Sequence, residues 1–446
     1  MSFSKSGRLK SNKLLIITSS AGGGLLQAAI ALEQEARAKD SDIHIVKRDV
    51  LKDWIWTALG KFCIAFWNKS QRGGHVRAQV FALKKQWLFD LFTWPNVLYK
   101  TLRILFEENF DRVIDTQMMG TSAIVTAIRI FNWKTGKKVV LEKIMVDLPT
   151  KEATHYFRAI KKLSKKNKRI LKLSTIAPLL EEGQTGEEFW QENCGISETD
   201  VHYAELNVRQ SFRKLQGKSR SNNSTPLPIR FKNKEELQLM LQCLDRGSIS
   251  YQINHEEVQF AIQPEDRVFT VLLGSQPAND ATLNYVKRFL SIAKEDQTVK
   301  LPTHLFVFCS DHEPRKMTLF RKVVDFVSRA KNYPKHFSVI PFSFQTDEAI
   351  APLFHRSDLT CTRSGGQTAM ELMAVSIGEM WIHSEAQKGE DLLSGIPGWE
   401  GASALYLQKL WGAKIVTPDT FVTHARRRCR SSDAQAAPRR DLESKA

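Results

Sequence analysis

The amino-acid sequence predicts an α/β fold of two doubly wound, Rossmann-like domains separated by a cleft. The chain has 446 residues, more than a single hydrophobic core usually holds, so two domains of about 200 residues each are expected. Short apolar segments alternate with helical segments, which is typical of parallel sheets covered by helices. Several apolar segments run directly into glycine turns, and in such folds ligands bind beyond the carboxyl ends of the strands.

The elements follow in this order along the chain. A strand at 14–18 runs into a glycine turn at 19–24 and a helix at 25–36, and further strands are expected at 43–46, 112–115 and 139–146. Residues 213–263 interrupt this alternation with a polar loop, a helix and a short strand. The alternation resumes with strands at 268–273, 304–309, 337–340, 358–362 and 380–383. We therefore expect an N-terminal domain at 1–212, an insertion or linker at 213–263, a C-terminal domain at 264–425 and a disordered basic tail at 426–446.

The most informative segment is 358–371, which has the pattern of a strand, a glycine turn and the start of a helix. Gly365 and Gly366 allow the backbone to approach a phosphate closely, and the positive end of the helix would face that anion. Thr368 and Glu371 have the spacing of a capping box. Glu371 has a second interpretation, since an acid near a phosphate turn can accept hydrogen bonds from a ribose diol.

A second turn of the same kind follows the apolar strand at 268–273, where Gly274-Ser-Gln276 precedes another helix. Both turns are expected at the carboxyl ends of strands in one sheet. Two such turns about ninety residues apart therefore favour a single nucleotide site.

Charge and composition limit the partners. Lys and Arg number 65 against 48 Asp and Glu, an excess that favours anionic partners such as phosphates or acidic lipid. No nucleic-acid-binding motif is present, so nucleic acid is a minor possibility. The six cysteines have neither disulfide-like pairing nor zinc-site spacing, and there is no acidic cluster for a metal, so no metal or other cofactor is expected.

The sequence lacks an apolar run long enough to span a bilayer and a signal-peptide core, so a cytoplasmic protein, soluble or peripheral on a membrane, is expected. Residues 54–106 interleave aromatic residues with Lys and Arg, a composition suited to lipid headgroups. Ordinary core aromatics on amphipathic helices explain the same pattern equally well. The basic run 161–172 could likewise contact anionic lipid or form a solvated helix face.

Six segments share a pattern with one known family: Ala21-Gly-Gly-Gly24, Val146-Asp-Leu-Pro-Thr150, the stretch 195–212, Gly274-Ser-Gln276, Arg363-Ser-Gly365 and Gly398-Trp-Glu-Gly-Ala-Ser403. Together they resemble glycosyltransferase family 28, whose members have the GT-B fold and include monogalactosyldiacylglycerol synthases and the N-acetylglucosaminyltransferase of peptidoglycan synthesis. The resemblance covers both halves of the chain. It implies a sugar transferred from a nucleotide donor, most often UDP-linked, to a hydroxyl acceptor that is expected to be lipid or lipid-linked, with inversion and without metal.

The resemblance also assigns residues to roles. Gly22, Gly23 and Gly24 form the acceptor-side loop. The nucleotide-sugar site comprises Gly274, Ser275, Gln276, Arg363, Ser364, Gly365, Gly366, Gln367, Thr368, Glu371, Glu400 and Ser403. Asp147, at the end of a buried strand, is the leading candidate for the base that takes the acceptor proton, and Glu152, His155 and His75 are alternatives.

The sequence also departs from the family. Leu25 stands where the family has a histidine after the glycine loop, and Trp399 and Ser403 replace the amide residues that flank the donor-sugar glutamate. These differences leave the sugar, the acceptor and the base open. Two other functions therefore stay under consideration: a nucleotide-sugar epimerase or hydrolase of the same fold, and a binding protein that has lost catalysis.

Overall fold

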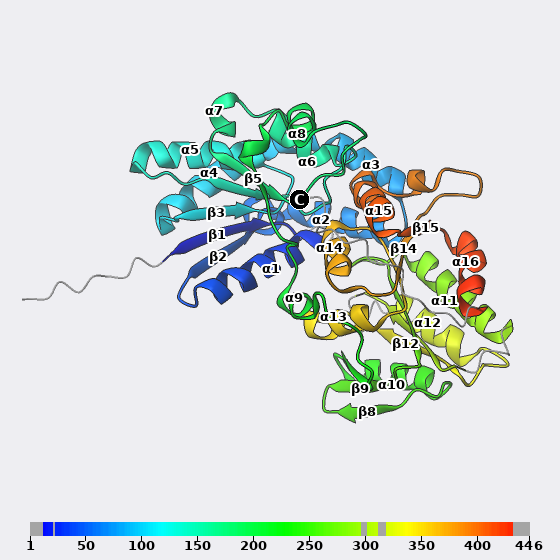
Figure 1. The fold of residues 1–446 in the computed structure, drawn as a ribbon. Helices are drawn as coiled ribbons and strands as arrows, with labels where there is room; N and C mark the ends of the chain where they lie inside the picture. Colours follow the sequence, from blue (N-terminus) through cyan, green and yellow to red (C-terminus); the bar gives the residue numbers. More distant parts are fainter. Residues whose placement is uncertain (1–11, 21–22, 296–300, 311–317, 431–446) are drawn as a thin grey trace, which may run out of the picture.

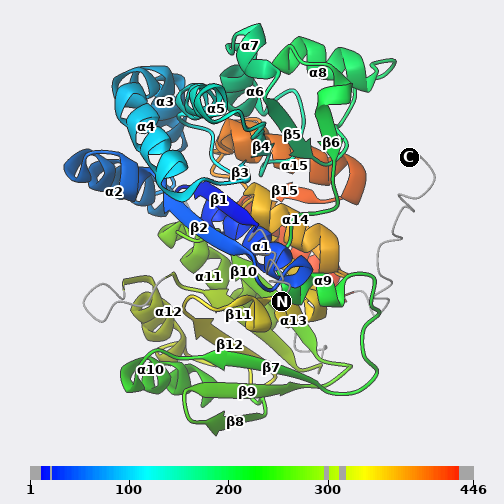
Figure 2. The same ribbon diagram turned by 90° about the vertical axis from the view of Figure 1, so that its left-hand side faces the viewer.

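The computed structural model describes residues 12–20, 23–295, 301–310 and 318–430, with side chains up to residue 425. Two six-stranded sheets of parallel strands form the centres of two domains (Figure 1). The N-terminal domain lies above the C-terminal domain in Figure 2, and helices cover both sheets. This arrangement of two doubly wound domains is the GT-B fold, and it confirms the predicted α/β class.

The N-terminal sheet has the strand order β2-β1-β3-β4-β5-β6. Its strands are β1 (Lys13–Thr18), β2 (His44–Asp49), β3 (Arg112–Asp115), β4 (Leu141–Ile144), β5 (Leu171–Thr175) and β6 (Val201–Tyr203). The central strand β1 pairs in parallel with β2 and β3 and is an almost unbroken apolar run, because both of its faces are buried. The strand order reverses between β1 and β3, so the glycine turn after β1 lies at the switch point of this sheet.

Three long or medium helices follow one another between β2 and β3, namely α2 (Thr57–Arg72), α3 (Val76–Lys84) and α4 (Gln86–Glu108), and the π-helical turn η1 (Val50–Trp54) precedes them. The other helices of this domain are α1 (Gly24–Lys39), α5 (Thr121–Thr135), α6 (Thr154–Lys161), α7 (Lys165–Lys168), α8 (Gly186–Cys194) and the 3-10 turn η2 (Glu198–Asp200). Helix α3 contacts both α2 and α4, so these three helices form one continuous unit on the side of the domain.

The C-terminal sheet has the order β12-β11-β10-β13-β14-β15. Its strands are β10 (Arg267–Leu272), β11 (Thr303–Phe308), β12 (Phe337–Phe342), β13 (Leu359–Thr362), β14 (Glu379–His383) and β15 (Lys414–Val416). The helices of this domain are α11 (Asn279–Glu295), α12 (Thr318–Ser328), α13 (Asp347–Arg356), α14 (Gly366–Val375), the 3-10 turn η3 (Leu392–Gly395), α15 (Gly398–Trp411) and α16 (Pro418–Arg430). The order reverses between β10 and β13, which are neighbours. The two predicted glycine turns follow these two strands, which is where doubly wound sheets bind ligands.

The segment predicted as an insertion or linker contains a small folded unit. The connecting helix α9 (Gln210–Leu215) is followed by β7 (Thr225–Arg230), α10 (Lys234–Leu244), β8 (Tyr251–Asn254) and β9 (Glu257–Ile262). The three strands form an antiparallel sheet in the order β7-β9-β8, and α10 packs on β12 and α12. This unit extends the C-terminal domain at its edge (Figure 2).

The C-terminal end of the described chain differs from expectation. Helix α16 continues to Arg430, so the prediction of a disordered tail from residue 426 is wrong for 426–430. The helix forms because its apolar face packs on α11, where the rings of Phe421 and Phe289 lie 4.6 Å apart. The remainder of the predicted tail, 431–446, lies outside the described residues. Within the described ranges, no helix combines the length and apolar character that crossing a bilayer requires.

Candidate active site at the domain interface

The glycine turn after β1 touches the turn after β10 in the other domain. Gly23 has a φ of +78°, which favours glycine, and a Cβ built on it would lie 2.6 Å from Ser275 Oγ. Only a residue without a side chain fits between the two turns. Gly24 begins α1, whereas Gly22 lies outside the described residues.

Asp147 follows β4 and reaches the start of α14. Its Oδ1 accepts a hydrogen bond from the Gly366 amide at 3.3 Å. A Cβ on Gly366 would lie 2.1 Å from the Val146 carbonyl oxygen, so glycine is required for this close approach. The positive end of the α14 dipole therefore faces the Asp147 carboxylate, which is the charge that a helix N-terminus favours.

The other carboxylate oxygen of Asp147 lies 3.0 Å from His155 Nε2, and both side chains are buried. His155 in turn contacts the edge of the Trp399 ring, with ring centroids 6.1 Å apart. Trp399 also packs on Trp67, at 5.2 Å between centroids. Asp147 and His155 thus form a pair that a residue of the C-terminal domain closes from one side.

Arg363 and Glu400 form a buried ion pair beneath the turn that follows β13. Arg363 Nε donates to Glu400 Oε2 at 2.9 Å, and Ser364 Oγ donates to the Glu400 carbonyl at 2.6 Å. Burial raises the pKa of the Glu400 carboxyl, and nearby Asp147 contributes in the same direction while Arg363 opposes it. The pair fixes Arg363 at the switch point of the sheet.

The turn after β10 is fastened to the N-terminal domain. Gly274 has a φ of +79°, a conformation that side chains disfavour. Arg72, at the end of α2, donates through Nε to Gln276 Oε1. This bond joins the α2–α4 unit to the predicted nucleotide site.

Glu371 is held by an arginine of the interdomain connection. Arg209 Nε and Nη2 donate to the two Glu371 oxygens at 2.7 and 2.9 Å, and Gln367 Nε2 donates to Oε1 at 3.1 Å. Both Arg209 and Glu371 are buried. Burial lowers the pKa of the Arg209 guanidinium, but the Glu371 carboxylate outweighs burial and raises this pKa overall.

The capping-box interpretation of Thr368 and Glu371 is wrong. Gly365 is the N-cap of α14, so the helix begins at Gly366 and Thr368 already lies within its first turn. Gly365 has an ordinary φ of −58°, and nothing lies within 4 Å of a Cβ built on it. At the start of the helix the Gly366 amide instead donates to Asp147.

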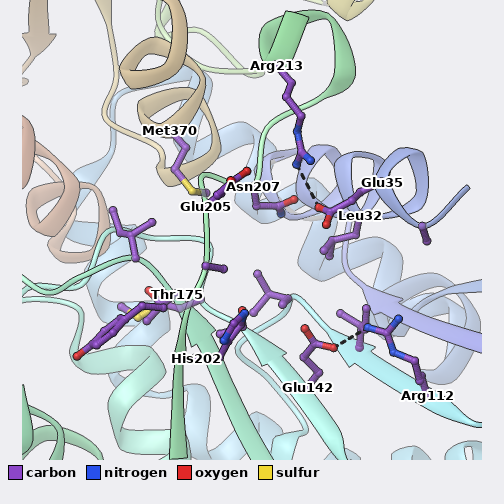
Figure 3. Close-up of a pocket in the computed structure, with 18 of the residues that line it drawn as sticks. Leu32, Glu35, Arg112, Glu142, Thr175, His202, Glu205, Asn207, Arg213 and Met370 are labelled. Atoms are coloured by element: carbon purple, nitrogen blue, oxygen red, sulfur yellow. Dashed lines mark hydrogen bonds and ion pairs between the residues drawn. The ribbon is translucent and has the colours of Figure 1, made fainter. Parts of the chain in front are cut away.

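The connection between the domains is bound to both of them. Within 204–213, the Ser211 amide donates to Asp347 Oδ2 of α13 at 3.2 Å, while Arg213 forms an ion pair with Glu35 of α1 at 3.1 Å. Figure 3 shows the ion pair of Arg213 and Glu35 at the edge of a cavity of about 650 Å³. This cavity lies on the face of the N-terminal sheet beside α1, with Asp147 in its wall.

The structure brings most of the predicted site residues together. Ser403 Oγ accepts a hydrogen bond from the Leu148 amide at 3.3 Å, so the predicted donor-sugar element also touches the Asp147 segment. His75 lies elsewhere, in the wall of another cavity with Glu385. Glu152 is exposed near His155. Among the described residues there is no group of three or more His, Cys, Asp or Glu that could hold a metal ion.

Three residues at this site had no predicted role. Arg72 stands in an ordinary basic helical segment, and nothing local distinguishes it from a surface cation. Arg209 belongs to the stretch 195–212 that resembles the family, but no role was predicted for it. Trp399 was noted only as a departure from the family pattern. Their contacts arise from the packing of one domain on the other, so only the tertiary structure reveals them.

The chain has distant relatives among solved structures. Neither a protein-family model nor a curated protein matches it. Among solved structures, MurG from Acinetobacter baumannii is 11% identical, with 93% of this chain and 89% of that chain covered at a TM-score of 0.43. UDP-GlcNAc 2-epimerase from Methanocaldococcus jannaschii is 12% identical, with 94% and 93% covered at 0.45, and a glycosyltransferase from Rickettsia africae is 11% identical, with 94% and 93% covered at 0.39. These similarities are too distant to carry an argument about activity, and the fold class rests on the strand order itself.

Proposed function

We propose that this protein is a glycosyltransferase that moves a sugar from a nucleotide donor, UDP-linked in our assignment, to a hydroxyl acceptor. One observation carries the proposal. The glycine turn after β13 contacts Asp147 of the Asp147–His155 pair across the interface, and the turn after β10 contacts Gly23 of the same N-terminal domain. A phosphate-type site in one domain thus adjoins a proton acceptor in the other.

The donor is assigned to the C-terminal domain. The Gly274 turn and the first turn of α14 supply backbone amides for a diphosphate, and Arg363 supplies a fixed positive charge. Glu371 is assigned to the ribose and Glu400 with Ser403 to the sugar. Arg209 forms an ion pair with the Glu371 carboxylate, so ribose binding would compete with this pair.

The reaction follows from these positions. Asp147 takes the proton of the acceptor hydroxyl, whose oxygen forms a bond to the anomeric carbon of the sugar. The bond from that carbon to the diphosphate breaks, and the nucleoside diphosphate leaves with the electron pair. The amides of α14 and Arg363 stabilise the charge that develops on the leaving group. His155, within hydrogen-bonding distance of Asp147, holds its carboxylate in place.

A lipid acceptor at a membrane surface is supported by the α2–α4 unit. Large apolar residues on these helices and the turn before them are exposed, among them Phe62 at 66% and Phe92 at 68% of the full residue surface. The full set is Trp56, Phe62, Phe66, Phe81, Trp87, Leu91, Phe92, Tyr99 and Phe106, and we call it the aromatic face. Exposed Lys61, Lys69 and Lys84 alternate with it. Aromatic rings beside cations suit the headgroup layer of an anionic membrane, although Trp54 is a buried core residue.

The test has two stages. Calorimetry measures UDP binding to the purified chain and to Arg363→Ala, which we expect to bind at least tenfold more weakly because it loses a charged phosphate contact. Donor turnover is then followed with and without lipid vesicles. Transfer of the sugar to lipid supports the proposal, whereas release of free sugar or of an epimerised donor identifies one of the alternative enzymes. UDP binding without turnover of any donor would indicate a binding protein.

A further inference from the structure

A second cavity, of about 210 Å³, adjoins the Asp147–His155 pair on the side of the aromatic face. Helices α3 and α4 form one wall and α6 forms the other. His155 and Trp399 both line it, so the cavity reaches the imidazole that contacts Asp147 and is bounded by the C-terminal domain as well. A hydroxyl group in this cavity would lie beside the imidazole that contacts Asp147.

Three cations surround this cavity. Lys84 comes from α3, Arg158 from α6 and Lys162 from the end of α6, and all three are exposed. None of them forms a salt bridge with another described residue, in contrast to nearby Lys151, which pairs with Glu181. Three unpaired cations at one opening favour an anionic group on the ligand.

The cavity also contains two acids, which narrows the class of ligand. Asp90 accepts a hydrogen bond from the Gly120 amide at 3.0 Å, and Glu152 is exposed at the opening. Burial raises the pKa of the Asp90 carboxyl, although the Gly120 hydrogen bond and Lys143 oppose this shift. Carboxyl groups accept hydrogen bonds from hydroxyls and repel a bare anion. A ligand with both phosphate and hydroxyl groups therefore matches this wall better than phosphate alone.

Trp87 connects the cavity to the aromatic face. It lines the cavity and is 50% exposed, and Leu91 follows it one turn along α4 with its side chain on the surface. A headgroup in the cavity could thus have its acyl chains directed along exposed apolar side chains.

Building on the proposed function, we infer that this cavity binds the phosphorylated polyol headgroup of the acceptor, with the phosphate among Lys84, Arg158 and Lys162 and a hydroxyl beside His155, the partner of Asp147. The inference names the class of acceptor that the glycosyltransferase would use. The phosphate can belong to a lipid headgroup, such as phosphoglycerol, or to a soluble polyol phosphate.

The experiment uses the full chain and the double variant Arg158→Gln, Lys162→Gln. The matched control is Lys165→Gln, Lys166→Gln, which removes the same charge from exposed positions of α7 that do not line the cavity. Each protein is sedimented with phosphatidylcholine vesicles that contain phosphatidylglycerol, or phosphatidylserine at equal charge. UDP binding is measured in parallel.

We expect the wild type and the control to prefer phosphatidylglycerol over phosphatidylserine, and glycerol 1-phosphate to compete. The cavity variant should lose about 10- to 30-fold in affinity for phosphatidylglycerol, as expected for two cations near a headgroup, while UDP binding stays unchanged. Tight binding of glycerol 1-phosphate alone, lost in the cavity variant, would support the site with a soluble source of the ligand. Equal binding to the two anionic lipids, or equal losses in both variants, would overturn the inference. Absence of UDP binding by the wild type would overturn the proposed function instead.

Discussion

Asp147 and Gly366 belong to different domains, yet the Asp147 carboxylate accepts a hydrogen bond from the Gly366 amide at 3.3 Å. The contact places the side chain assigned as the base at the positive end of the helix assigned to the donor diphosphate. Both assignments can be tested by changing one side of this contact at a time.

Gly366→Ala should disrupt the interface. The added methyl carbon would lie 2.1 Å from the Val146 carbonyl oxygen, so the backbone must move, and we expect a loss of about 1–3 kcal/mol in the free energy of unfolding together with weaker UDP binding. Denaturant titration and calorimetry measure the two effects. Gly365→Ala is the matched control, because its Cβ meets nothing within 4 Å and its φ is ordinary. Equal effects of the two substitutions would refute this view of the interface.

Asp147→Asn should abolish most of the turnover while UDP still binds. The amide cannot accept the acceptor proton, so we expect the rate of transfer to fall by about 10²- to 10⁴-fold. Initial rates at saturating donor give this value, and calorimetry gives the affinity for UDP. Glu182→Gln serves as the control, since Glu182 is exposed and lines neither of the two cavities. A variant with near-normal transfer would remove Asp147 from the role of base.

Arg209→Gln should destabilise the protein more than the double variant Arg209→Gln, Glu371→Gln. The single change leaves a buried carboxylate without its bidentate partner, for which we expect a loss of about 3–5 kcal/mol in the free energy of unfolding. In the double variant no uncompensated charge remains, so part of this stability should return. Denaturant unfolding of all four proteins completes the cycle. Additive losses would mean that the two side chains do not depend on each other.

Glu385 should make stability depend on pH in the acid range. Burial by itself would raise its pKa, but His383, Arg363 and His75 hold the pKa below the ordinary value of 4.5. The folded state therefore favours the ionised carboxylate, and the resulting stability is present above about pH 4.5 and is lost as the pH falls through the lower folded-state pKa. Melting temperatures of the wild type and Glu385→Gln should differ near neutral pH and approach each other in acid. A difference that grows in acid would contradict this sign.

The fold could be predicted because its signals are local. The apolar strands at 268–273 and 358–362 and their glycine turns lie within a few residues of each other in the sequence, and the structure contains them as β10 and β13 with the following turns. The two turns lie next to each other because β10 and β13 are neighbours in the sheet, and the periodicity of apolar residues does not specify this strand order. The same limitation applies to the folded unit within 213–263, whose short strands pair only with one another.

The site was predicted less completely, for a physical reason. Asp147 could be chosen because it ends a buried strand, but its partner His155 was one of several candidates, and the contact depends on the start of α6. The role of Glu371 at the ribose stays a prediction, and its partner Arg209 lies 162 positions earlier in the chain. Thr368 was misassigned because the glycine pair allowed the helix to begin at Gly366. Pairs that form across an interface leave no trace in local spacing.

The clamped connection at 204–213 has a mechanical consequence for the whole molecule. Because Ser211 and Arg213 fix this segment to α13 and α1, the two domains are joined at one edge of their interface, and this edge would act as the hinge of a rotation between them. Helix α9 and helix α2 lie at opposite sides of the interface in Figure 2. Any rotation that admits a donor would displace atoms in proportion to their distance from that edge. Trp67 and Trp399, whose rings pack at a tilt of 32°, would then separate early, so the fluorescence of this tryptophan pair should report the opening of the cleft.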